Sequence, residues 1–113
     1  MDKLEKYRQS IKKVLTEYHE WVSGSSNLSR ESCLIVDEVH DQYMWLFMGW
    51  EGKKKIRNIH VHIRIKNNKI YIEEDWTEEG IANELLREGV LKEDIVLAFH
   101  DPESRKYTDF AIA

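Results

Sequence analysis

The clearest pattern of hydrophobic and polar positions lies between Lys53 and Gly89. Within it, Ile59 to Lys66 alternates between apolar and polar residues, and this period of two predicts a β-strand. The pair Asn67-Asn68 follows directly, and asparagine tolerates the positive φ of a type I′ hairpin turn. The strand is expected to have two distinct faces, with Ile59, Val61, Ile63 and Ile65 on the apolar one and His60, His62, Arg64 and Lys66 on the polar one.

The run K-I-Y-I-E, which begins at Lys69, supplies the returning strand of this hairpin. A two-residue turn fixes which residues face each other, and the apolar positions of the two strands then coincide. The cross-strand pairs expected are Ile65 with Ile70, Ile63 with Ile72, Arg64 with Tyr71, and His62 with Glu73.

The chain before the hairpin predicts one helix and three strands. Residues 2–22 have the 3–4 spacing of an amphipathic helix, with Asp2 as N-cap and the cluster at 23–27 as its end. Strands are expected at 32–36, 43–50 and 55–66, separated by turns, so that with the returning strand they form a four-stranded antiparallel meander. The segment Tyr43–Trp50 is apolar on both faces, as in a strand covered on both sides or one that faces a second subunit. On this basis we expect a homo-oligomer, most simply a dimer.

After the hairpin, a second helix is expected to open at Asp75 or Thr77 and to end at Gly89, a natural C′ residue. Asp75 with Glu78 has the layout of a capping box. A buried strand is expected at 95–99, and residues 107–113 are expected to add a short extended segment. The fold class is therefore α+β, in a single domain spanning 1–113.

Composition and charge limit the classes of function that fit this chain. The chain has 113 residues, one cysteine (Cys33) and no apolar run long enough to cross a bilayer, so a cytoplasmic protein without disulfides is expected. The net charge of −4 argues against a dedicated DNA-binding domain. However, Lys53–Lys69 carries seven Lys or Arg and no acid, whereas Glu73–Glu103 carries eleven acids. The basic stretch could make weak, salt-sensitive contact with DNA.

Several longer motifs together cover essentially the whole chain. They are the opening M-D-K-L-x-x-Y-R-x-x-I-x-x-V-L, then T-E-x-G-I-A-x-E-L from Thr77, G-V-x-K-x-D-I-V-L-x-F-H-x-P from Gly89 and T-x-F-A-x-A from Thr108. With these motifs the chain closely resembles the XisI family; Leu91 departs from it, since relatives often have proline there. The positions that carry the resemblance include Gly49, Trp50, Thr77, Gly80, Glu84, Asp94, His100, Pro102, Arg105 and Phe110.

The resemblance implies a controlling factor for excision of the fdxN element, a DNA rearrangement in cyanobacterial heterocyst development. In that system a separate recombinase exchanges the strands, and XisI and XisH are accessory factors. The family brings no catalytic residues with it. Because XisI and XisH act in the same system, an XisH-like protein is the expected partner. Neither a cofactor nor a metal is expected.

Three sets of residues are candidates for chemistry or binding. His60 and His62, about 7 Å apart on a strand, could share a metal with Glu73, although nearby positive charges disfavour this. Asp37 with Glu51 and Lys53 has the D…E-x-K layout of metal-dependent nucleases, which is an alternative function. Aromatic and charged side chains favour a third possibility, a protein-binding surface formed by Trp50, His60, His62, Arg64, Lys66 and Tyr71.

Overall fold

The structure is a computed structural model that describes residues 2–24 and 30–113. Helix α1 (Lys3–Ser23) confirms the predicted N-terminal helix, and Asp2 caps it by accepting a 2.8 Å hydrogen bond from the backbone N–H of Glu5. The part of the predicted terminating cluster at 25–27 lies outside the described residues. No helix among the described residues is long and apolar enough to cross a membrane.

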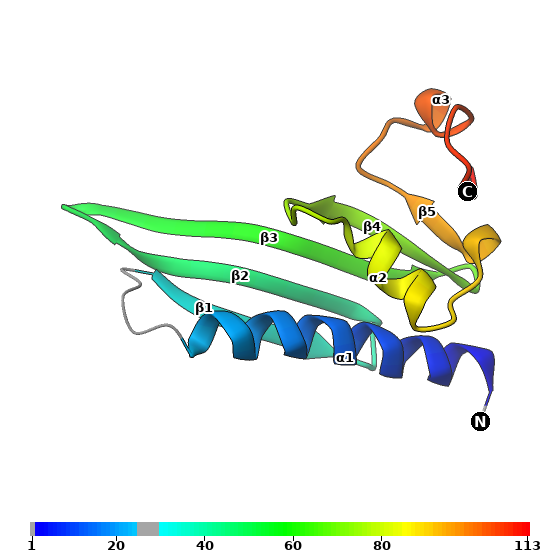
Figure 1. Cartoon of the computed structure of the whole chain (residues 1–113). Coiled ribbons are helices and arrows are strands. Elements are labelled where there is room, and N and C mark those ends of the chain that lie inside the picture. The colour runs from blue at the N-terminus through cyan, green and yellow to red at the C-terminus, as the bar shows by residue number, and fades with distance from the viewer. Residues whose placement is uncertain (1, 25–29) are drawn as a thin grey trace.

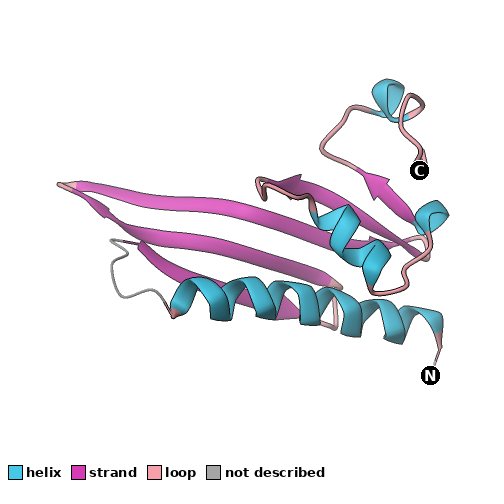
Figure 2. Cartoon of the chain, viewed as in Figure 1, coloured by secondary structure: helices cyan, strands magenta, loops and turns pink. Residues whose placement is uncertain are grey.

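Five strands form one sheet in the order β1-β2-β3-β4-β5. The first four pair antiparallel, which confirms the predicted meander, and the fifth pairs parallel to β4 (Figures 1 and 2). The parallel pairing is possible because a helix and a turn connect β4 to β5. The strands are β1 (Arg30–Asp37), β2 (Gln42–Glu51), β3 (Lys54–Lys66), β4 (Lys69–Asp75) and β5 (Ile95–Leu97).

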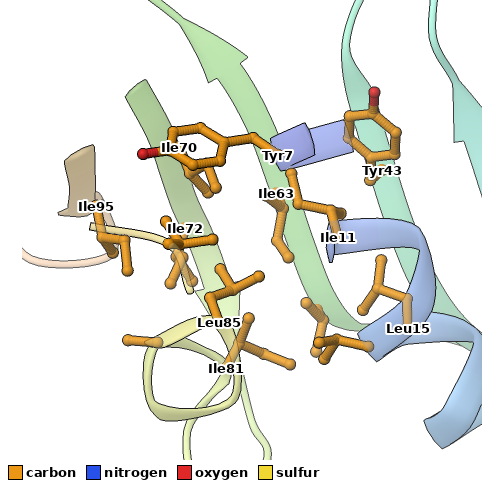
Figure 3. Packing of buried hydrophobic residues seen from close by; sticks show 14 of the residues in the cluster. Tyr7, Ile11, Leu15, Tyr43, Ile63, Ile70, Ile72, Ile81, Leu85 and Ile95 are labelled. Carbon is orange, nitrogen blue, oxygen red and sulfur yellow. The ribbon is translucent and has the colours of Figure 1, made fainter. Parts of the chain in front are cut away.

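Helices α1 and α2 (Ile81–Arg87) cover one face of the sheet (Figure 1). Their apolar side chains meet those of β2 to β5 in a single core (Figure 3). The 3–4 spacing of α1 places its apolar stripe on the sheet, whereas Trp21 lies off that stripe and is 79% exposed. Fully buried members of the core include Ile11, Leu15, Tyr43, Ile63, Ile70, Ile72, Ile81, Leu85 and Ile95.

The turn between β3 and β4 is the one predicted, with φ of 53° at Asn67 and 63° at Asn68. The pairs nearest this turn, Ile65 with Ile70 and Arg64 with Tyr71, are also as predicted. The turn residues and the apolar positions next to them therefore predicted this part of the hairpin correctly.

Two β-bulges overturn the predicted pattern further from the turn. On the β2 side His60 is an extra residue, because Val61 opposes Trp45 and Ile59 opposes Leu46. His60 and Val61 consequently both face the helices, so the prediction that His60 lies with His62, and Ile59 with Val61, was wrong.

The second bulge lies in β4, where Glu73 is the extra residue. His62 opposes Glu74 there, so the predicted pairing of His62 with Glu73 was also wrong. The bulge turns Asp75 toward the helices, where its carboxylate accepts hydrogen bonds from the N–H groups of Thr77 (2.9 Å) and Ile81 (2.7 Å).

Helix α2 starts later than the sequence suggested, at Ile81 rather than near Asp75 or Thr77. Asp75 reaches over the intervening turn to hold the first helical N–H, and Gly80 has φ of +94°, which no α-helical residue adopts. The predicted end is confirmed: Gly89 has φ of +93° and the Val90 N–H bonds to the carbonyl of Leu85.

The C-terminal region contains a 3₁₀ turn, η1 (Lys92–Asp94), and a short helix, α3 (Pro102–Arg105), that the sequence did not predict. The strand expected at 95–99 ends at Leu97, and the segment expected at 107–113 makes only an isolated bridge from Ala111 to Val96. The Arg105 guanidinium holds this region together by donating to the carbonyls of Ala98, His100 and Ile112.

Candidate interaction surface

No helix of the described chain covers the second face of β1, β2 and β3, which we call the open face (Figure 1). Side chains alternate along each strand, so residues next to core positions point to this side. Ile35 on β1 is 51% exposed there, although it is large and apolar. The apolar side chains of the open face include those of Cys33, Ile35, Met44, Leu46, Met48 and Ile59.

Charged residues surround these apolar positions. Arg64 forms an ion pair with Glu73 at 2.9 Å. Lys66 lies over the ring of Tyr71 at 4.9 Å, and that ring is almost fully buried. Three of the predicted binding residues, Arg64, Lys66 and Tyr71, therefore lie together on this side of the sheet. Arg64 already pairs with Glu73, and Lys66 lies over the Tyr71 ring.

Trp50 lies near the tip of the β2–β3 hairpin, on the open face and 59% exposed. The ammonium group of Lys55, directly opposite on β3, is 5.0 Å from its ring centroid. This arrangement leaves most of the indole available to another molecule. Of the six predicted binding residues, Trp50 and Lys66 are exposed, whereas the other four are buried or half-buried.

The two histidines have separate environments. His60 packs edge-on against Trp45 (4.9 Å between centroids) and Phe47 (5.5 Å), and burial lowers its pKa. His62 lies on the open face, where its Nε2 is 2.9 Å from the amide oxygen of Gln42, and burial lowers its pKa as well. Because the bulge puts the two rings on opposite faces, they cannot share a metal ion. Among residues 2–24 and 30–113 there is no cluster of three potential metal ligands.

The residues of the nuclease alternative are also far apart. Asp37 pairs with Gln42 at one end of β2, whereas Glu51 and Lys53 lie at the hairpin tip at the other end. β2 has 10 residues, so its ends are roughly 30 Å apart at about 3.3 Å per residue. Asp37 instead closes its own turn, and the hydrogen bond with the His40 side chain is the main cause of its lowered pKa. The structure does not assemble the D…E-x-K constellation.

An open strand edge is a feature that the sequence did not reveal. β3 runs on beyond β4, because their pairing ends at Val61 with Asp75 (Figure 2). We call residues 54–60 of β3 the β3 edge. Within the described chain, the one backbone hydrogen bond to it other than those of the β2 ladder is 2.9 Å long, from the Trp76 N–H to the carbonyl of His60.

A hollow of about 640 Å³ lies alongside the β3 edge. Trp76 is 69% exposed at its border, and its indole N–H donates to Glu74 at 2.7 Å. This hydrogen bond orients the ring beside the strand. The hollow is lined by Arg57, Asn58, Ile59, His60, Glu74 and Trp76.

Most positions that carry the family resemblance have structural roles in this fold. Asp94 is buried and bonds to Tyr7, while Thr77 and Gly80 shape the turn before α2. The remaining positions other than Trp50 are also part of the scaffold, as the bonds of Arg105 show. Gly49 pairs with Ile56, Glu84 with Arg87, His100 closes a turn, Pro102 opens α3, and Phe110 packs on the core.

Comparison with known proteins agrees with this architecture. The model of the XisI protein family matches residues 1–112. The chain belongs to the XisI family. A solved structure from Anabaena variabilis ATCC 29413, described as the fdxN element excision controlling factor XisI, is 42% identical, with a TM-score of 0.86 over 99% of this chain and 100% of that one.

A second XisI structure is similarly close. It is an XisI-like protein from the same organism, with 38% identity and a TM-score of 0.89 over 98% of this chain and 100% of that one. No curated protein matches the chain. The XisI assignment made from motifs is thus confirmed over the whole length.

Sequence reasoning missed two features of the surface, the β3 edge and Trp76. Both depend on where the β3–β4 pairing stops, which is set by the bulge at Glu73 and by Asp75 turning toward α2. The signal available in the sequence was the unequal length of the two strands. The basic, alternating run before Asn67 is much longer than the run after Asn68.

Proposed function

We propose that this protein is an accessory factor in the control of excision of a DNA element, and that it acts by binding another protein rather than by catalysis. Membership of the XisI family and the name of its Anabaena relative support the excision-control role. An XisH-like protein is the proposed partner. The observation that carries the binding mechanism is the β3 edge with its adjoining hollow.

The β3 edge is suited to accept an extended segment. The two-residue turn after Glu51 makes Glu51 and Lys54 a hydrogen-bonded pair, so alternate pairs along the ladder are not hydrogen bonded. By this count Lys55, Arg57 and Ile59 direct their backbone N–H and C=O groups away from β2. Such a row of unpaired groups can be extended by a strand from another chain.

The chemistry of the partner segment follows from the side chains beside this edge. Lys53, Lys54, Lys55 and Arg57 are all exposed, and none forms an ion pair among the described residues. An acidic strand would complement them, whereas a basic one would be repelled. The exposed indole of Trp76 offers an aromatic anchor at the border of the hollow.

The experiment is co-expression with an XisH-family protein encoded alongside this one, followed by size-exclusion chromatography with light scattering. A stoichiometric complex is expected. Lys55→Pro should weaken it, since proline removes an outward N–H without touching the β2 ladder. Trp76→Ala should weaken it too, while Trp21→Ala, which removes a similarly exposed tryptophan on α1, serves as the matched control. Failure of two folded proteins to associate would overturn the proposal.

Direct contact with DNA is a second candidate function, favoured by the exposed lysines at the hairpin tip. Acids concentrated in the second half of the chain would oppose it. Such binding should therefore be weak, independent of sequence and steeply reduced by salt. A fluorescence anisotropy titration of a short duplex at two salt concentrations tests this, and Lys53→Glu with Lys54→Glu should abolish any signal.

A further inference from the structure

The strand register arranges the open face in rows that cross β1, β2 and β3. One row contains Glu31, Met48 and Arg57 in that order. The next rows place Leu46 between Cys33 and Ile59, and Met44 between Ile35 and His62. In each of these three rows the middle position, on β2, is apolar, whereas the row nearest the β1–β2 turn has Gln42 between Asp37 and Arg64.

The ends of the first row carry opposite charges. Glu31 lies on β1 and Arg57 on β3, and both side chains are exposed. Neither takes part in an ion pair within the part of the chain that the structure describes, although Arg64 and Glu73, on the same side of the sheet, pair with each other. The open face is thus acidic on one side of β2, basic on the other and apolar between them.

This pattern is complementary to itself. If a second copy lies face to face with the first, related by a two-fold axis along β2, each β1 lies over the partner's β3. We propose that two copies of this chain associate in this way, with each Glu31 against the other copy's Arg57. The half-buried Met44 and Met48 of β2 then meet their own counterparts at the axis, on either side of Leu46, which is only 5% exposed. A two-fold interface requires this correspondence of each surface with itself.

The packing is compatible with the rest of the fold. Sheets stack face to face about 10 Å apart, with their strands nearly aligned. A two-fold axis along β2 places β4, β5 and α3 of each copy beyond the other copy's β1, so they do not obstruct it. The opposite face is filled by α1 and α2, and pairing two β3 edges would set Arg57 against Arg57. The open face is therefore the surface that suits a second copy.

The test is the mass in solution, measured by light scattering and sedimentation equilibrium over a range of micromolar concentrations. We expect a dimer, with twice the 13.5 kDa mass of one chain. Glu31→Arg alone and Arg57→Glu alone should each raise the dissociation constant roughly tenfold or more, because each sets like charges together. The double variant, with both charges exchanged, should restore the wild-type constant.

The controls separate this interface from general effects of charge and folding. Glu20→Arg makes the same charge change on α1 and should leave the dimer intact. Ile35→Lys should disrupt it through the apolar part of the face. A monomer throughout the range, or a dimer indifferent to both single charge reversals, would overturn the inference. Circular dichroism shows that each variant is folded, and binding of an XisH-like protein at the β3 edge is measured separately.

Discussion

The hydroxyl group of Tyr7 donates a 2.6 Å hydrogen bond to the carboxylate of Asp94, although 87 residues separate them. The bond joins α1 to the turn that precedes β5, and the ammonium group of Lys3 adds an ion pair at 3.0 Å. Asp94 is only 7% exposed. Burial acts to raise its pKa, but the donors Tyr7 and Lys3 outweigh it and the pKa is lowered. Burial and this bond raise the pKa of Tyr7 to about 12.

Tyr7→Phe should therefore destabilise the protein. The substitution leaves the ring in the core but removes one donor from a buried carboxylate, at a cost of about 1–3 kcal/mol. Urea denaturation followed by fluorescence measures the free energy of unfolding. Tyr107→Phe is the matched control, since Tyr107 is 81% exposed, and should change stability by less than about 0.5 kcal/mol. Equal effects of the two substitutions would show that the Tyr7–Asp94 bond contributes little.

Removing the carboxylate of Asp75 should weaken the start of α2. Asp75→Ala leaves the N–H groups of Thr77 and Ile81 without their acceptor, and losing a comparable cap costs about 0.5–2 kcal/mol. Asp75→Asn keeps one acceptor oxygen and should cost less. Glu78→Ala provides the control, because Glu78 is exposed and makes no side-chain hydrogen bond among the described residues. Thermal unfolding of the three variants should rank them in that order.

His60 should make stability depend on pH in the mildly acidic range. Burial lowers its pKa in the folded protein, so the unfolded chain, with a pKa near 6.5, binds the proton more readily. Stability is then highest when His60 is neutral and falls as the pH drops below about 6.5. His60→Phe keeps a ring against Trp45 and Phe47 but cannot titrate. The unfolding free energy of this variant should fall less steeply than that of the wild type between about pH 7 and pH 5.5. An unchanged slope would contradict a lowered pKa of His60 in the folded protein.

The C-terminal region should loosen when Arg105 is replaced. Its guanidinium donates to three backbone carbonyls, those of Ala98, His100 and Ile112, and no other described side chain joins these segments in this way. In Arg105→Ala, the amide of Ala111, which bonds to the carbonyl of Ile95, should exchange with solvent faster. Exchange in α1 should stay at the wild-type rate. Lys106→Ala, one residue away and paired with Glu103, should leave Ala111 protected.

The sequence predicted those elements whose signal is local. The alternating run and Asn67-Asn68 determine the hairpin, because turn type and period two both act within a few residues. Helix α1 followed from its 3–4 spacing and from Asp2. The start of α2 did not, since it depends on Asp75 reaching past a glycine with positive φ.

The surface was less predictable for a related reason. Which face a side chain occupies depends on every residue between it and the turn, and a single bulge inverts all positions beyond it. His62, Arg64 and Lys66 lie between the turn and the bulge, so the predicted grouping of these three is correct. His60 is the bulge itself, and the grouping fails there. The sequence motifs identified the family correctly. Most residues of these motifs stabilise the fold, so they do not mark an interaction surface.

Because His60 is an extra residue in β3, the alternation of side chains between the two faces shifts by one residue number there. Nearer Asn67, odd-numbered side chains point to the helices; nearer Gly52, odd-numbered side chains point to the open face. A chimera that joins the tip of one family member to the base of another must therefore be aligned by which face each side chain occupies, and not by residue count across the bulge. Deleting His60 alone would restore regular alternation between Val61 and Ile59, and would leave Arg57 on the open face and Ile56 toward the helices.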